Sequence, residues 1–249
     1  MKLAAVLAAL TVMVLAAVAL FAPATLLDAR LYAATEGQLR LANTTGSAWN
    51  GRGLVTNAQH TWSIPVGWKV DPFSIVRGDV VIALQAIPGE DVPRGEIAWR
   101  NSNLTMNGVA FTLPATALNG AISQGNAIAI GGTIAFDAPN VSWNATGGEG
   151  TATARWSGAR LAGNAGMVAL GTVGVSFAPR NGRIQGRVES RGGEINVDGE
   201  FTWGVAGLDV HATLTPLPAT PPAIVRALGA IGTPDANGAI RVQWHSGTR

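Results

Sequence analysis

The sequence contains no cysteine, which excludes a disulfide, a thiolate metal site and a cysteine nucleophile. Charged residues make up only 13% of the 249 residues, about half of the usual share. The basic residues are dispersed, and nearly all are arginine, with Lys2 and Lys69 as the two lysines. No basic stripe interleaved with aromatic residues is present, so we expect no nucleic-acid partner.

Residue patterns typical of catalytic or metal sites are missing as well. His60, His211 and His245 lie far apart in the sequence, without a spacing typical of metal ligands. There is no Gly-x-Ser-x-Gly elbow, no Gly-x-x-x-x-Gly-Lys phosphate loop and no pair of carboxylates in an apolar context. We therefore expect a non-enzymatic protein with no cofactor and no metal.

One long apolar run is present, at the N-terminus. Leu3–Ala22 contains no charge, and twenty helical residues span about 30 Å, the thickness of the hydrocarbon core of a membrane. Lys2 precedes the run, which by the positive-inside rule places the N-terminus in the cytoplasm. Residues 1–25 are therefore predicted to be an uncleaved single-pass anchor. The alternative is a cleaved signal peptide, with Ala22 and Ala24 at cleavage-like spacing.

Beyond residue 35 the apolar residues alternate with a period of two, which is typical of antiparallel strands. Asn181-Gly182, Gly192-Gly193 and Ala206-Gly207 are spaced like the two-residue turns of successive hairpins. They predict a four-stranded meander over residues 171–214. In this register Phe177 faces and covers Gly186, Val188 faces Val197, Ile184 faces Phe201, Arg187 faces Asp198, Arg191 faces Glu194, Trp203 faces Val210, Phe201 faces Ala212 and His211 faces Thr202.

Other segments follow the same pattern. Alternation predicts strands over 80–84, 126–136 and 240–244, with Gly131-Gly132 bending a continuous strand, and a hairpin that turns at Asn107-Gly108. One helical turn is expected at 114–118, and a short C-terminal helix within 220–232, which begins with prolines and stops at Gly232. No long linker divides the chain. We expect one mainly β domain over 26–249, an antiparallel meander curled as a groove, a sandwich or a barrel-like sheet.

Eight tryptophans are present. Trp49 lies in GSAWNGRG, residues 46–53, where the glycines favour either a hairpin corner that the ring plugs or an exposed binding loop. The strand tryptophans share faces with small or aliphatic residues, so we expect them to line a core or a groove rather than to form exposed platforms. These are Trp99, Trp143, Trp156 and Trp203.

Three stretches resemble the type II secretion system protein N family, and their order covers nearly the whole chain. The first is TGSAWNGRG at 45–53. The second, GWKVDPFSIVRGDV at 67–80, is similar to the Trp-x-x-x-Pro-Leu-x-Leu-x-x-Gly block of the family, with Phe73 and Ile75 at the leucine positions. The third, PPAIVRALGAIGTPDANGAIRVQWHSG at 221–247, is similar to the C-terminal helix, Leu-Gly-x-Pro-Asp turn and closing strand of the family.

The resemblance implies an accessory component of the machine that exports folded proteins from the bacterial periplasm. It implies an inner-membrane location, a periplasmic β domain and partners among other secretion components, such as the inner-membrane platform or the secretin. It supplies no catalytic residue. The motif residues are expected to be structural, with partner contact as a second role: Trp49, Gly51, Trp68, Pro72, Gly78, Pro234 and Asp235.

Two alternatives stay open. A sheet with one apolar face suggests a periplasmic lipid-binding or lipid-transfer groove, with lipid as a further partner. A secreted structural or adhesive β protein would follow if the N-terminal segment were cleaved.

Overall fold

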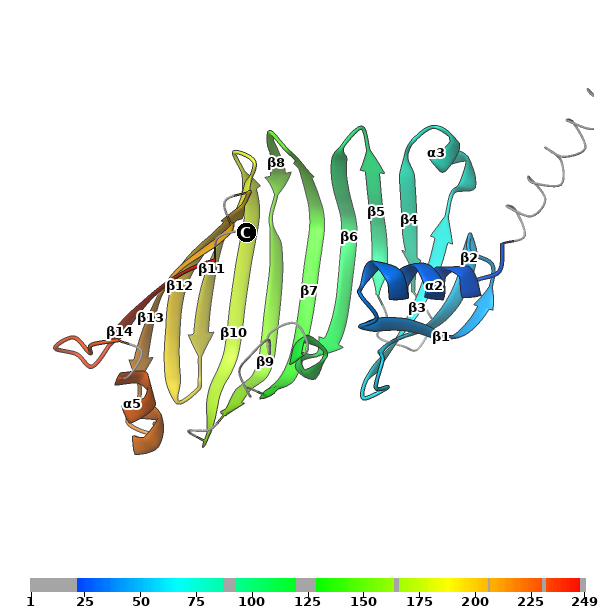
Figure 1. The fold of residues 1–249 in the computed structure, drawn as a ribbon. Helices are drawn as coiled ribbons and strands as arrows, with labels where there is room; N and C mark the ends of the chain where they lie inside the picture. The colour runs from blue at the N-terminus through cyan, green and yellow to red at the C-terminus, as the bar shows by residue number, and fades with distance from the viewer. Residues whose placement is uncertain are drawn as a thin grey trace, which may run out of the picture. The chain divides into compact units, whose positions relative to one another are not determined.

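A computed structural model describes residues 22–86, 93–119, 129–163, 166–205, 207–229 and 232–246 of the chain. The chain divides into two compact units, Met1–Pro93 and Arg94–Arg249 (Figure 1). The predicted anchor Leu3–Ala22 lies outside the described residues apart from Ala22, so the division between an anchor and a domain near residue 25 stays a prediction. No helix within the described ranges is both long enough and apolar enough to cross a membrane.

Unit 1 is a small antiparallel sheet with a helix packed on it. The sheet order follows the sequence, and each strand pairs with the next. Val80, Ile82 and Leu84 form a strand, as the alternation predicted. The elements are α2 (Thr25–Ala34), β1 (Leu39–Gly46), β2 (Asn50–Asn57), β3 (Ser63–Val70), α3 (Pro72–Val76) and β4 (Val80–Gln85).

An ion pair fixes α2 to the sheet of unit 1. The Asp28 carboxylate accepts hydrogen bonds from Arg40 Nε at 3.0 Å and Arg40 Nη2 at 2.7 Å, and one from the backbone N–H of Leu41 at 2.8 Å. These hydrogen bonds favour the ionised carboxylate and so lower the pKa of Asp28. The bond from Arg40 has the largest effect, and the bond from the Leu41 N–H comes next. Leu27 and Leu31, both half-buried, pack against the cluster around Leu41, so the helix covers part of the sheet.

Unit 2 is a longer antiparallel sheet in which β8 pairs with one end of β7 while β9 pairs with the other end. A 3-10 turn and a C-terminal helix accompany it, as the sequence predicted at 114–118 and within 220–232. The elements are β5 (Arg94–Arg100), β6 (Asn103–Pro114), η1 (Ala115–Leu118), β7 (Ala129–Asn144), β8 (Gly147–Gly150), β9 (Ala152–Gly163), β10 (Gly166–Arg180), β11 (Arg183–Arg191), β12 (Ile195–Gly204), β13 (Gly207–Pro216), α5 (Pro222–Gly229) and β14 (Ile240–Ser246).

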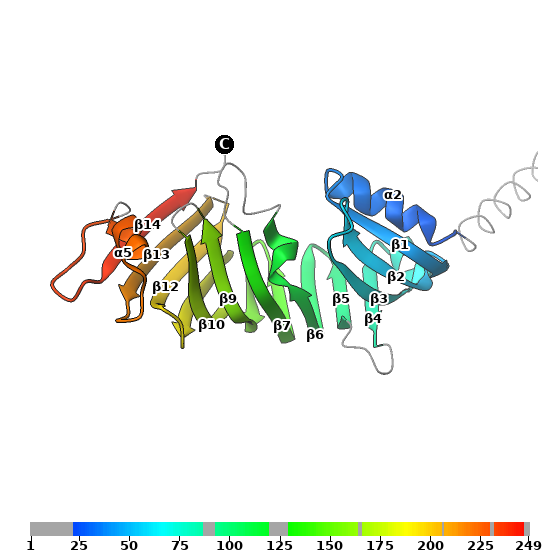
Figure 2. The same cartoon turned by 90° about the horizontal axis from the view of Figure 1, so that it is seen from below.

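The sheet of unit 2 is curved but not closed. Its strands run from β5 to β14, and α5 lies on the concave side (Figures 1 and 2). The mainly β, meandering fold is thus confirmed, and so are the bend of β7 through Gly131-Gly132 and the closing strand at 240–244. Residues 126–128 of the predicted strand 126–136 lie outside the described residues. Because the sheet stays open, the sandwich and barrel-like alternatives are wrong for this unit.

The first predicted turn of the meander is confirmed. Asn181 and Gly182 have φ angles of 51° and 70°, the left-handed values that a type I′ turn requires. Arg180 pairs with Arg183 across this turn, and Phe177 faces Gly186 as predicted. The absence of any helix between residues 183 and 203 is also as expected.

The second turn lies one residue later than predicted, which shifts the β11–β12 ladder by two residues. The third predicted turn includes Ala206, which lies outside the described residues, but the β12–β13 ladder is likewise shifted by two residues. Each side chain keeps its predicted face, but its partner changes. Arg187 forms an ion pair with Asp198 at 2.9 Å across a diagonal instead of facing it. The predicted pairs Val188–Val197, Ile184–Phe201, Arg187–Asp198, Arg191–Glu194, Trp203–Val210, Phe201–Ala212 and His211–Thr202 are wrong, and the observed ones are Val188–Gly199, Ile184–Trp203, Arg187–Glu200, Arg191–Thr172, Trp203–Leu208, Phe201–Val210 and His211–Glu200.

The shift after β11 has a local cause. The segment after Arg191 stays against β10, where the Glu194 N–H donates to the Ala169 carbonyl at 2.7 Å and the Glu194 side chain accepts from the Ala169 N–H at 2.9 Å. Gly193 is needed for this close approach, since a Cβ there would lie 2.4 Å from the Leu170 carbonyl carbon. Gly193 therefore serves backbone packing, and the chain turns one residue later.

The ring that covers Gly186 is that of Phe201, not of Phe177 as predicted. A Cβ at Gly186 would lie 2.3 Å from Phe201 Cε1 and Cζ. Phe177 instead belongs to the cluster of Phe136 and Val141, with its ring 6.1 Å from that of Phe136. Phe201 is the neighbour of Gly186 on the β12 side, so the two-residue register shift explains the exchange.

The predicted hairpin at Asn107-Gly108 is also wrong. β6 runs through both residues, and its ladder to β5 slips there by one residue, so that Arg94 faces Ala110 while Glu96 faces Asn107. Gly108 has a φ angle of 58°, which suits a β-bulge as well as a turn. The chain turns instead at Asn101-Ser102, with φ angles of 48° and 62°.

Substitution of Gly186 tests the contact with Phe201. Gly186→Ala should lower the free energy of unfolding by about 1–3 kcal/mol, because the methyl group overlaps the Phe201 ring. The matched control is Gly174→Ala, where a Cβ meets nothing closer than the Glu189 carbonyl oxygen at 3.9 Å. Urea unfolding followed by far-UV circular dichroism measures both variants. Equal stability of the two would contradict the register of β11 and β12.

The ion pair of unit 1 predicts a pH dependence. Because the folded pKa of Asp28 is lowered, the unfolded chain binds more protons at acidic pH. The pair therefore stabilises the fold fully above the unfolded pKa of about 3.9, and this stability is lost as the pH falls through the folded pKa. The unfolding temperature of the wild type should therefore fall more steeply toward low pH than the unfolding temperature of Asp28→Asn. The control is Glu149→Gln, at an exposed position of β8; parallel curves for Asp28→Asn and wild type would contradict the assignment.

Candidate partner-contact sites

The first motif, residues 46–53, forms the corner between β1 and β2. Gly46 has a φ angle of 91°, and the Ser47 N–H donates to the Asn50 carbonyl at 2.9 Å. The Ser47 hydroxyl oxygen accepts from the N–H groups of Trp49 at 3.3 Å and Asn50 at 3.1 Å. The hairpin corner expected at Trp49 is therefore present, with the Trp49 side chain half-buried.

A second tryptophan packs against this corner. Trp68 of β3 is 5% exposed, and its Nε1 donates to the Ser47 carbonyl at 3.2 Å. A Cβ at Gly51 would lie 2.7 Å from Trp68 Cζ2, so the glycine leaves room for the ring. The structure thus brings Trp49, Gly51 and Trp68 of two sequence motifs together, with Trp68 buried at their centre.

The second motif continues into a tip built around α3. Asp71 caps the helix by accepting from the Phe73 N–H at 3.0 Å, and Pro72 occupies the first turn. The Ser74 side chain is 2% exposed and donates to the Asp71 carbonyl at 2.6 Å. Gly78, with a φ angle of 83°, ends the turn. This supported tip leaves Phe73 69% exposed and Ile75 44% exposed.

The third motif forms a tight turn before β14. The Asp235 carboxylate accepts from the N–H groups of Asn237 at 2.8 Å and Ala239 at 3.0 Å, and the Gly238 N–H donates to the Asp235 carbonyl at 2.9 Å. Pro234 forms an isolated bridge with Ile240. Pro234 and Asp235 are exposed and belong to unit 2, and their hydrogen bonds stabilise the turn.

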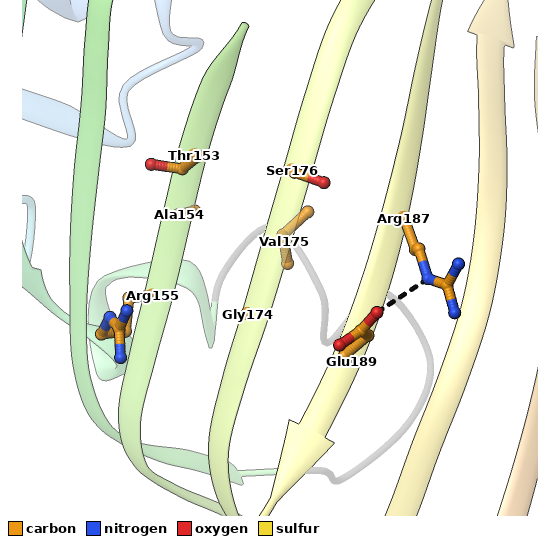
Figure 3. A pocket seen from close by; sticks show the side chains of 8 residues that line it. All are labelled: Thr153, Ala154, Arg155, Gly174, Val175, Ser176, Arg187 and Glu189. Atoms are coloured by element: carbon orange, nitrogen blue, oxygen red, sulfur yellow. Dashed lines mark ion pairs between the residues drawn. The ribbon is translucent and has the colours of Figure 1, made fainter.

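A shallow polar depression lies on the charged face of unit 2 (Figure 3). It measures about 310 Å³ and forms over Gly174, which has no side chain to fill the space. The Arg187 and Glu189 side chains at its edge form an ion pair at 2.8 Å. These two charges are thus used within the chain, whereas Arg155 at the other edge forms no ion pair with any described residue. The lining residues are Thr153, Ala154, Arg155, Gly174, Val175, Ser176, Arg187 and Glu189.

The opposite face of unit 2 is apolar. One row across five strands reads Phe177, Gly186, Phe201, Val210 and Trp244, and the next reads Val175, Val188, Gly199, Ala212 and Val242. No member of these two rows carries a charge or a side-chain hydrogen-bonding group other than the indole N–H of Trp244. Ile224 and Leu228 of α5 cover one end of the face, in a cluster with Val173, Ile195 and Ile240.

The strand tryptophans lie on this apolar side, as expected for core or groove lining. Trp156 is half-buried, and its Nε1 donates to the Gly131 carbonyl at 2.9 Å. The rings of Trp143 and Trp203 lie 6.5 Å apart. Trp99 and Trp203 are 48% and 50% exposed, so these two are less covered than the core interpretation implied.

In the part of the chain that the structure describes, no three His, Asp or Glu side chains lie close enough to hold a metal ion. His211 approaches Asp209 at 3.3 Å on the exposed face.

Comparison with known families gives one match. The model of the family described as "Type II secretion system (T2SS), protein N" matches residues 37–243. This chain belongs to that family. Neither the search of curated proteins nor the search of solved structures found a match.

The family match extends over both units. It starts two residues before β1 and ends inside β14, so all three motifs noted in the sequence lie wholly or largely within it. The resemblance to the type II secretion protein N family is thereby confirmed. The family assigns the chain an accessory role in type II secretion, in association with the cell envelope.

Sequence reasoning missed the exposure of Phe73 and Ile75. It identified both positions, but only as replacements of leucine in the second motif. Asp71 and Pro72 signalled the start of a short helix, but no local signal gave the outward direction of Phe73, since it is Ser74 that is buried.

The buried and exposed aromatic residues of unit 1 give a direct test. Trp68→Ala should lower the free energy of unfolding by about 3–5 kcal/mol, as for other buried aromatic truncations. Phe73→Ala should change it by less than about 0.5 kcal/mol, because the side chain is exposed. Chemical unfolding followed by far-UV circular dichroism distinguishes the two. A Trp68→Ala variant as stable as Phe73→Ala would contradict the structural role of Trp68.

Proposed function

We propose that this protein is an inner-membrane accessory component of the type II secretion apparatus, held by a helix over Leu3–Ala22. Residues 26–249 lie in the periplasm and contact other secretion components, either the inner-membrane platform or the secretin. The family match supports the secretion role, and the uncharged run behind Lys2 supports the anchor and its orientation. The protein acts without catalysis.

The observation that carries the contact is the α3 tip. An exposed phenylalanine costs little to bury in a partner when its backbone is already fixed, because binding then loses little conformational entropy. Asp71, Ser74 and Gly78 provide this fixed backbone, and Phe73 and Ile75 provide the apolar anchors. Aromatic anchors of this kind dominate the energetics of many interfaces. The partner is thus a secretion component with an apolar pocket.

A photo-crosslinking amino acid at position 73 tests the contact in secreting cells. We expect it to capture a component of the secretion apparatus, whereas the same amino acid at position 205 should not, although Val205 is 94% exposed. Phe73→Asp should lower secretion at an unchanged amount of protein. Capture from position 205 alone, or normal secretion by Phe73→Asp together with Ile75→Asp, would contradict the α3 contact.

Topology is tested separately. An alkaline phosphatase reporter fused after Arg249 should be active, because that enzyme folds only outside the cytoplasm. Isolation of a soluble mature form that starts near residue 23 or 25 would contradict the anchor and favour a cleaved signal peptide.

A further inference from the structure

β14 is an edge strand of unit 2. Among the described strands it pairs only with β13, through an unbroken ladder that covers the whole length of β14 (Figures 1 and 2). An edge strand presents a row of backbone N–H and C=O groups with which a strand of another chain can pair. The outer edge of β14 is therefore a candidate binding site for an extended polypeptide.

The turn before β14 shows which way the backbone groups of the strand point. Ile240 lies between Leu214 of β13 and Pro234, with which it forms an isolated bridge on the other side. On that outer side the Ala239 carbonyl accepts from the Asp235 N–H at 2.9 Å. Because the backbone groups of successive residues alternate between the two sides of a strand, the odd-numbered residues of β14 point outward and the even-numbered ones point toward β13.

Gln243 and His245 are the outward-pointing residues beyond this turn. Their outward N–H and C=O groups form no hydrogen bond with any of the described residues. Native sheets protect such edges with proline, lysine, a bulge or a covering segment. Residues 242–246 contain neither proline nor lysine, and their ladder to β13 has no register shift. This part of β14 therefore keeps the regular geometry that a further strand requires.

The edge strand of unit 1 is protected by contrast. In β1 the Leu39 N–H donates to Thr35 Oγ1 at 3.0 Å, and the Leu41 N–H donates to Asp28 Oδ1 at 2.8 Å. Side chains of the same chain thus already use the outward N–H groups of β1, whereas those of Gln243 and His245 stay available.

The side chains of β14 select the chemistry of the added strand. Trp244 lies on the apolar face and is 52% exposed, so a strand beside it buries apolar surface if its neighbouring residue is apolar. Arg241 and Gln243 lie on the polar face, where Arg241 forms no ion pair with any of the described residues. A carboxylate opposite Gln243 would lie diagonally from Arg241, the arrangement in which Arg187 and Asp198 form their ion pair.

From these observations we infer that the outer edge of β14 binds an extended segment of another protein, which adds a strand to unit 2. The segment carries an acidic residue opposite Gln243, with an apolar residue before and after it on the side of Trp244. A second copy of this chain fits less well, because β14 contains no acidic residue to place beside Arg241. The inference adds a binding site to the chain and does not depend on the α3 contact.

The test uses the full chain in a mild detergent and a short synthetic peptide in which valine and threonine alternate, with glutamate in place of the central threonine. Fluorescence anisotropy of the labelled peptide measures the Kd. Methyl groups on the backbone nitrogens of the glutamate and the threonines block the N–H groups that would face β14, whereas methyl groups on those of the valines leave these N–H groups free.

We expect the first methylated peptide to bind at least about tenfold more weakly than the second, because it loses backbone hydrogen bonds to the edge. Lysine in place of the glutamate should also weaken binding, because it repels Arg241. Equal affinity of the two methylated peptides, or no binding of the unmethylated peptide, would overturn the inference.

A proline substitution tests the same edge from the side of the chain. Gln243→Pro removes one outward N–H and leaves the ladder to β13 intact, because the even-numbered residues form that ladder. It should raise the Kd of the unmethylated peptide about tenfold, whereas the matched control Gln243→Ala, which keeps the N–H, should change it by less than about twofold. Equal affinity of the two variants would overturn the inference, and so would a wild-type dimer in sedimentation that Gln243→Pro alone dissociates, since a second copy would then occupy the edge.

Discussion

The separation of apolar and polar residues onto the two faces of one antiparallel sheet is the constraint on which unit 2 depends. Alternate residues of a strand point to opposite faces, and each ladder from β10 to β14 keeps the same residues on the same side. Ion pairs such as Arg187–Asp198 lie on the polar face, and the valines and phenylalanines lie on the other. Because the sheet does not close, the apolar face has to be covered by something other than the sheet itself.

In each unit a short helix covers part of the apolar face of the sheet. In unit 1, α2 brings Leu27 and Leu31 onto the sheet and is fixed by the Asp28–Arg40 ion pair. In unit 2, α5 places Ile224 and Leu228 on one end of the apolar face. Trp203 and Trp244 on the same face remain 50% and 52% exposed, and the α3 tip of unit 1 leaves Phe73 exposed as well.

Much of this fold follows from the sequence, and the errors have a common cause. Alternation with a period of two fixes the face of each residue but is unchanged by a register shift of two, so Val188 was assigned to Val197 instead of Gly199. Glycine was ambiguous in a similar way, since Gly108 forms a bulge and Gly193 a close backbone approach where turns were predicted. The role of the motif residues stays a prediction, and the outward direction of Phe73 depends on contacts that no local pattern encodes.

The family assignment places the chain in type II secretion, and the proposed anchored accessory role makes one central claim about cells. Deletion of the gene, with and without a plasmid that restores the chain, tests it by measuring the secreted substrate proteins inside and outside the cells. The account predicts that substrates stall in the periplasm, or that less of the apparatus assembles, and that the plasmid reverses both. Normal secretion combined with altered lipid composition or outer-membrane permeability would contradict it.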